Sequence, residues 1–180
     1  MKWSKLRSLL AERVAPSVRA RIDLHQARYR YTLEESGRVW VTVEGREVAS
    51  FDTASYVARR HIVAAGIREA NGLRPYGNAG GHAAYIEADA QAEDILRRAG
   101  EYDDNRALED LEAYLSMSIE DALASPSPLV RALASVDGRV GKRRLRTLAA
   151  ERGHHPLVRA LLTARCEAEK VQFGTPADRA

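Results

Sequence analysis

One hexapeptide occurs twice in this chain and constrains its fold more than any other feature. Pro-Leu-Val-Arg-Ala-Leu fills 128–133 and returns unchanged at 156–161, an offset of 28 residues. Proline is well tolerated in the first turn of a helix, where its missing N–H would have no partner, and each copy follows a suitable starting residue, Ser127 or His155. The apolar residues of each copy share one helical stripe. A helix start repeated at this period predicts stacked helix pairs, each burying its apolar face against a neighbour.

The C-terminal region, 118–173, is therefore predicted to be all-helical and to contain two short helix pairs. Two pairs are fewer than the roughly three repeats that a free-standing array needs. We expect them to pack on the preceding part of the chain, 1–117, and to share its core. The last residues, 174–180, are predicted to form a disordered tail. The expected helices of the region cover 118–124, 128–136, 139–150 and 156–170.

The N-terminal part carries the strand signals. Val39, Val41 and Val43 alternate with other residues before Glu44-Gly45, and an apolar segment follows that turn, which is the pattern of a β-hairpin. A strand within 21–32 would complete a three-stranded antiparallel meander. Helices are predicted at 2–15, 53–70, 83–99 and 104–116.

The predicted fold class is α+β. A small three-stranded antiparallel sheet is covered by helices and is followed by the all-helical region with its two short helix-pair repeats. Because such a sheet must bury its apolar face, we expect the helices at 2–15 and 53–70, which flank it in sequence, to provide the cover.

Composition limits the functional classes. With 45% apolar and 29% charged residues in 180, the chain has the make-up of a globular protein. No apolar run approaches the roughly 20 residues that cross a bilayer, so no membrane partner is predicted. The single cysteine, Cys166, excludes an intrachain disulfide and fits a reducing compartment, which predicts a cytoplasmic location.

The net charge of +3 conceals a strong polarity along the chain. Residues 1–33 carry +6, residues 34–84 carry 0, residues 85–124 carry −9 and residues 125–180 carry +6. An acidic segment between basic ones either forms an interaction surface or is neutralised within the fold. We favour neutralisation, because segments joined by short connections usually lie side by side.

The basic run at 139–146 is the strongest functional signal. On one continuous helix, Arg139, Lys142, Arg143 and Arg146 would form a single cationic stripe that suits a row of phosphates or an acidic partner. These four residues are the predicted anion- or partner-binding site. The competing interpretation is a solvated face, or one neutralised by Glu109, Asp110 and Glu112.

The sequence offers no pattern for catalysis or metal binding. No two histidines have the helical spacing and third ligand of a zinc site, and His82 beside Glu87 and Asp89 is the only cluster that would justify a metal test. Cys166 follows Val158 at helical spacing and is predicted to lie in the core. We therefore predict no catalytic residue, no metal and no cofactor, although residues distant in sequence can converge in a fold.

Two resemblances extend this interpretation. The segment 124–133, with its partial echo at 153–161, resembles the HEAT-type helical repeat, which places a proline ahead of a Val-Arg pair at the start of a second helix. That resemblance implies a curved helical scaffold that binds proteins or, less often, nucleic acids. The whole chain is also similar to a family of small uncharacterised bacterial proteins, through 1–6, 40–43, 47–49, 118–123 and 140–145. The family has no established activity and transfers no site.

The predicted function is accordingly non-enzymatic. We expect a cytoplasmic binding or regulatory protein that engages a macromolecular partner, most simply another protein, through the helical-repeat region. The first alternative is a nucleic-acid-binding protein that uses the basic run at 139–146, and the second is an immunity protein to a bacterial toxin. The sequence leaves the identity of the partner and the oligomeric state open.

Overall fold

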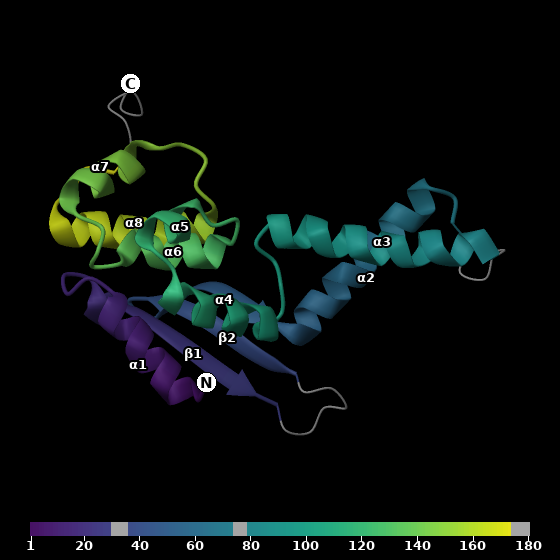
Figure 1. Cartoon of the computed structure of the whole chain (residues 1–180), viewed down its shortest axis with the longest axis horizontal. Helices are drawn as coiled ribbons and strands as arrows, with labels where there is room; N and C mark the ends of the chain where they lie inside the picture. The colour runs from purple at the N-terminus through teal and green to yellow at the C-terminus, as the bar shows by residue number, and fades with distance from the viewer. Residues whose placement is uncertain (30–35, 74–78, 174–180) are drawn as a thin grey trace.

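The computed structural model describes residues 1–29, 36–73 and 79–173, so the predicted tail at 174–180 lies outside the described residues. Figure 1 shows the order of the elements. They are α1 (Trp3–Arg13), a short 3₁₀ turn (Arg19–Arg21), β1 (Ile22–Arg28), β2 (Gly37–Val43), β3 (Arg46–Asp52), α2 (Thr53–Ala70), α3 (Ala79–Arg98), α4 (Asp104–Ser116), α5 (Ile119–Ala124), α6 (Pro128–Val136), α7 (Lys142–Ala150) and α8 (Pro156–Glu169). The α+β class is confirmed.

The sheet is an antiparallel meander in the order β1-β2-β3. Glu44 and Gly45 both have positive φ, of 53° and 75°, which is the backbone of the tight hairpin turn predicted there. One face buries Val39 and Val41 completely, while the other carries Trp40, whose ring stacks on His25 with centroids 5.0 Å apart. Alternation of this kind leaves one face to be covered by helices.

The cover of the sheet differs from the prediction. The main contacts to the strands come from α1, α4 and α8, whereas the main strand contact of α2 is with β3, the strand that it follows. The long apolar stripe of α2 packs instead against α3, where Arg68 of α2 forms an ion pair with Asp89 and lies over the ring of Tyr85. The expectation that 53–70 covers the sheet is therefore wrong, because periodicity identifies which face is buried and not what buries it.

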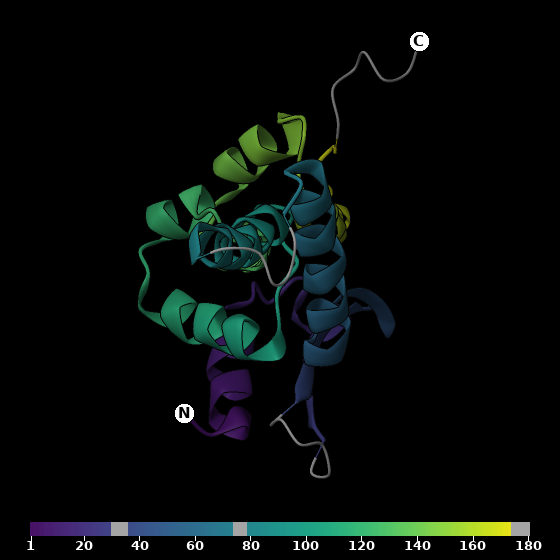
Figure 2. The ribbon, with the colours of Figure 1, turned by 90° about the vertical axis from the view of Figure 1, so that its right-hand side faces the viewer.

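The α2–α3 hairpin projects from the rest of the molecule (Figure 1), and Figure 2 looks at the molecule from the side of this hairpin. In Figure 1 the C-terminal helices lie at upper left and α1 at lower left, and both pack on the same buried face of the sheet. The isoleucines at 62, 86 and 95 on the hairpin are exposed, so its helices leave apolar side chains uncovered.

The two copies of the repeated hexapeptide form equivalent helix starts. Each proline stands in the first turn of its helix, α6 or α8, and the two helices pack against each other. A side chain added at Gly100 would collide with both Pro128 and His155, so both helices begin at the same place. Arg165 of α8 donates to the carbonyl of Ser135 near the end of α6, at 3.3 Å. The two helices therefore run side by side in the same direction.

The main hydrophobic cluster joins the sheet to these helices. It contains Leu6 of α1, Val41 of the sheet, Leu111 of α4, Leu133 of α6 and Leu161 of α8. A smaller cluster lies between α7 and α8 and includes Leu145 and Cys166. Residues of the predicted N-terminal part, 1–117, and of the predicted helical region, 118–173, thus contribute to one cluster.

Candidate functional site

The predicted basic helix is shorter than expected. It begins at Lys142, with Gly141 in the extended conformation of the preceding cap, and ends at Ala150. The first turn has no side-chain cap, and Leu145 and Ala149 bury the inner face. Lys142, Arg143 and Arg146 are exposed on the outside of this helix.

Arg139 does not lie on the helix that carries the other three cations, which corrects the prediction of one continuous helical stripe. It lies in the turn between α6 and α7, three residues before the helix starts. Its guanidinium donates to Asp137 Oδ2 at 2.8 Å and to the carbonyl of Met117 at 3.0 Å. The prediction of one helix over 139–146 was wrong because Asp137-Gly138 is a turn sequence. The buried carboxylate of Asp137 binds the Arg139 guanidinium and holds it at this turn.

Asp137 connects the turn to the core. Its side chain is only 1% exposed and also accepts a hydrogen bond from the hydroxyl of Tyr114. Burial favours the protonated acid, but hydrogen bonds from Arg139 and Tyr114 outweigh it and lower the pKa of Asp137. Arg165, itself buried, donates to the backbone carbonyls around this turn. Arg139 is thus a structural residue of the α6–α7 turn.

The acidic residues expected to neutralise the basic run have other partners. Glu109 and Asp110 lie near Arg106 on their own helix, and Glu112 pairs with the N-terminal amine at 2.7 Å. The one ion pair of α7 among the described residues joins Arg144 to Glu120, at 2.8 Å. The interpretation that Glu109, Asp110 and Glu112 neutralise the basic run is therefore wrong.

The consequence is a small cationic face on α7, formed by Lys142, Arg143 and Arg146. Within residues 1–29, 36–73 and 79–173 these three side chains make no ion pair. On a helix, positions 142, 143 and 146 project from neighbouring turns on one side. The face can attract an acidic surface without first breaking an internal contact.

A second feature has no signal in the sequence. It is a cleft of about 470 Å³ that we call the arginine cleft. Its walls are the end of α3, the start of α4 and the start of α6, elements that come together only in the fold. Tyr102 and Ser127 line it as well. Its charged side chains are Asp94, Arg97, Arg98, Arg106, Asp110 and Arg131.

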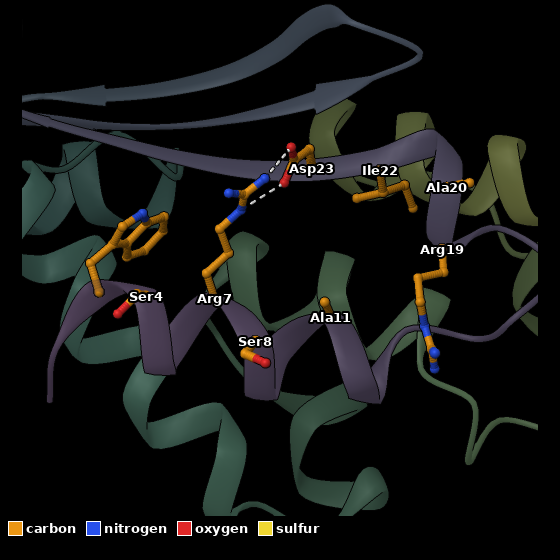
Figure 3. Close-up of a pocket in the computed structure, with 9 residues that line it drawn as sticks. Ser4, Arg7, Ser8, Ala11, Arg19, Ala20, Ile22 and Asp23 are labelled. Carbon is orange, nitrogen blue, oxygen red and sulfur yellow. Dashed lines mark hydrogen bonds and ion pairs between the residues drawn. The ribbon is translucent and has the colours of Figure 1, made fainter.

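A third depression, between α1 and β1, is wider but internally satisfied. It has a volume of about 560 Å³, and its charged groups bond to the protein itself. Figure 3 shows Arg7 making two hydrogen bonds to Asp23, of 3.0 and 2.6 Å. Arg19 donates to backbone carbonyls of Glu12 and Val14. With its charges compensated in this way, the groove offers little attraction to an ion.

The remaining candidates for chemistry are Cys166 and the cluster around His82. Cys166 is buried as predicted, and burial raises the pKa of its thiol to about 11, so it is not a reactive thiolate at neutral pH. In the part of the chain that the structure describes, no three His, Cys, Asp or Glu side chains gather into a metal-binding group. His82 with Glu87 and Asp89 therefore gains no support as a metal cluster.

Comparison with known proteins identifies the family of the chain. A family model described as the SF0329 protein family matches residues 2–166. The chain belongs to the SF0329 protein family. Comparison with curated proteins and with solved structures gives no significant match. The family name carries no activity, so function has to be argued from the surfaces described above. Among the described helices, none combines the length and the apolar character that crossing a membrane requires.

Proposed function

We propose that this member of the SF0329 family is a non-enzymatic binding protein that engages an acidic protein partner through α7. The observation that carries the proposal is the cationic face of Lys142, Arg143 and Arg146, which forms no ion pair within the described residues. Exposed like charges that repel one another are stabilised when an opposite charge approaches, so this face favours association with an acidic surface.

A protein partner suits the size of this face better than a nucleic acid. Affinity for a nucleic acid grows with the number of phosphates neutralised, and specific complexes use many such contacts. Only three cations remain after Arg139 is assigned to the α6–α7 turn. A protein surface with two or three carboxylates matches this number. Nucleic-acid binding is kept as an outcome of the test below.

The arrangement of the C-terminal helices supports a scaffold role. The pairs α5–α6 and α7–α8 place their second helices side by side and parallel, as stacked helix-pair repeats do, and we extend the HEAT-type resemblance on this basis. The proposal includes a bacterial and cytoplasmic setting, which the single buried cysteine suits. An immunity protein would be one such binder, with a toxin as its acidic partner.

Affinity capture with the full chain from a host that encodes it tests the proposal. The variant K142E/R143E/R146E reverses the face, and the matched control K2E/K5E/R28E changes net charge equally at exposed residues away from α7. We expect the first variant to lose a captured acidic protein that the wild type and the control retain after nuclease treatment.

Two outcomes would contradict the proposal. Capture that disappears for the wild type after nuclease treatment would indicate a nucleic-acid partner. Capture that is equal for the wild type and the α7 variant would remove the cationic face from the interaction. Salt titration of the purified complex adds a second measurement, because the loss of three charges should flatten the salt dependence of Kd.

A further inference from the structure

Arg131 is the residue of the arginine cleft whose environment demands an explanation. It lies on α6 in the first copy of the hexapeptide and is half-buried. Its Nε is fully buried and has no hydrogen-bond partner. Among the described residues its guanidinium also forms no ion pair. A guanidinium has five donors and a fixed charge, so burying its Nε–H at a cavity wall without an acceptor is costly.

The wall of the arginine cleft carries more positive than negative side chains. Four arginines line the cavity against two aspartates. Arg97 and Arg98 share one carboxylate, that of Asp94, with both distances 2.6 Å. Arg106 pairs with Glu109 at 3.1 Å and lies 3.5 Å from Asp110, whose other oxygen accepts a hydrogen bond from Ser127. The internal carboxylates are therefore already occupied, and the wall keeps a surplus of guanidinium donors.

The neighbouring cavity repeats this pattern. It has a volume of about 170 Å³ and shares Arg97, Tyr102 and Arg106 with the arginine cleft. Arg60 of α2 lines it, and the Nε of Arg60 is likewise buried without a hydrogen-bond partner. The two buried, unpartnered side-chain atoms found among the described residues thus belong to arginines that line adjoining cavities.

Packing and hydrogen bonds fix the side chains of Tyr102 and Ser127 at the base of the cleft. Tyr102 is 6% exposed and stacks on Phe51 with ring centroids 4.8 Å apart. Because the single proton of the Ser127 hydroxyl goes to Asp110, the hydroxyl of Tyr102 donates to Ser127, at 3.1 Å. Burial raises the pKa of Tyr102, so this donor stays protonated at neutral pH. A fixed polar floor beneath the arginine side chains is suited to orienting a small ligand.

We propose that the arginine cleft binds a small molecule that carries more than one oxyanion group, either phosphate or carboxylate. Its volume falls within the range of small-molecule sites, and guanidinium groups recognise both oxyanions through paired hydrogen bonds. None of the residues that line the cleft belongs to α7. The cleft is therefore a second site, and its ligand is independent of the macromolecular partner proposed above.

Nuclear magnetic resonance titration of the ¹⁵N-labelled full chain tests this assignment. The probes are pyrophosphate and citrate, each added at constant ionic strength against sodium chloride. We expect one or both to shift the amides of Tyr102, Arg106 and Ser127 in a saturable way. The probe that binds more tightly identifies the ligand as a phosphate or as a carboxylate.

The repeated hexapeptide provides a matched pair of variants, Arg131→Gln and Arg159→Gln, since Arg159 holds the same place in the second copy and is exposed. Arg131→Gln should weaken binding by about tenfold or more, the loss expected for charge-assisted hydrogen bonds. Arg131→Lys should bind with intermediate affinity, because it retains the charge and loses the planar fork. Arg159→Gln should bind like the wild type.

Three results would overturn the assignment. These are no saturable shift with either probe, equal affinity for the wild type and Arg131→Gln, or shifts confined to 142–146 that vanish in K142E/R143E/R146E. The unligated spectrum and Tm of Arg131→Gln provide the fold control. Removing an unpartnered guanidinium should leave both close to the wild-type values, so a loss of affinity reports on binding.

Discussion

The helices α6 and α8 start with the same six residues and have different surroundings. In α6 every residue of the copy except Arg131 is buried, because α4, α5 and α8 all pack on it. In α8 the copy buries Leu157, Val158 and Leu161, while Pro156 and Arg159 are exposed. The shared sequence dictates one helix start and one apolar stripe, and the neighbouring elements decide how much more is covered.

The caps of the two helices show the same contrast. Ser127 caps α6 with its hydroxyl, which also bonds to Asp110 and Tyr102. His155 caps α8 through Nδ1, which accepts from the amide of Leu157 at 3.2 Å, and its Nε2 donates to the carbonyl of Ala99. One cap belongs to a buried polar network and the other to a surface connection. A repeated sequence therefore need not produce repeated chemistry.

Substitutions at the C-terminal ends of α6 and α8 should give the largest difference in stability between the two helices. Asp137→Asn, just after α6, removes the negative charge of a buried ion pair with Arg139, and we expect a loss of about 3 kcal/mol at pH 7. Lys170→Gln, at the exposed end of α8, should change stability by less than about 0.5 kcal/mol. Urea unfolding of both variants measures the free energies.

The effect of Asp137→Asn should depend on pH in a defined direction. Because folding lowers the pKa of Asp137, its contribution is present above the ordinary value of about 4 and is lost as the pH falls through the folded-state pKa. The wild type and Asp137→Asn should therefore converge in stability in acid. A difference of the same size at pH 7 and at pH 3 would contradict the assigned role of the carboxylate.

Substitutions at the alanine inside each copy of the hexapeptide should give an intermediate difference in stability. Ala132 of α6 is completely buried, whereas Ala160 of α8 is half-buried. Ala132→Leu should destabilise the protein by about 2 kcal/mol through overpacking, and Ala160→Leu by less than about 1 kcal/mol. Thermal unfolding with calorimetric enthalpies compares them. Equal losses would mean that the two helices are packed alike after all.

Substitutions of the two N-terminal caps, Ser127 and His155, should give the smallest difference in stability. Ser127→Ala removes a cap and leaves the buried Asp110 without one donor, which should cost about 2 kcal/mol. His155→Ala removes a cap near the surface and should cost about 1 kcal/mol. Chemical denaturation of the pair, with Ser116→Ala as an exposed non-cap control, checks the order. A larger loss for His155→Ala would reverse the ranking of the two networks.

Much of the fold followed from local chemistry. The hairpin at Glu44-Gly45 follows from a glycine that tolerates positive φ, and the limits of α2 follow from the Asp52 cap and the Asn71-Gly72 stop. The start of α7 was misplaced because helical periodicity was extended across Asp137-Gly138. That dipeptide was the available signal that Arg139 lies in a turn.

The sites followed from the sequence only in part. The exposed cations of α7 lie within one short segment, 142–146, so a pattern search can find them. The arginine cleft draws its residues from α3, α4 and α6, and no local pattern links Arg97 to Arg131. The unpartnered state of Arg131 depends on which carboxylates the fold brings near, so the sequence alone gave no signal for it.

The sequence by itself determined the elements, their apolar faces and the equivalence of the two helix starts, since these depend on backbone propensities and on residues a few positions apart. Only the tertiary structure decided that α2 packs on α3 rather than on the sheet, that Asp137 binds Arg139, and that Arg131 faces a cleft while Arg159 faces solvent. The physical reason is that burial and charge pairing are set by distances in space between residues far apart in the chain.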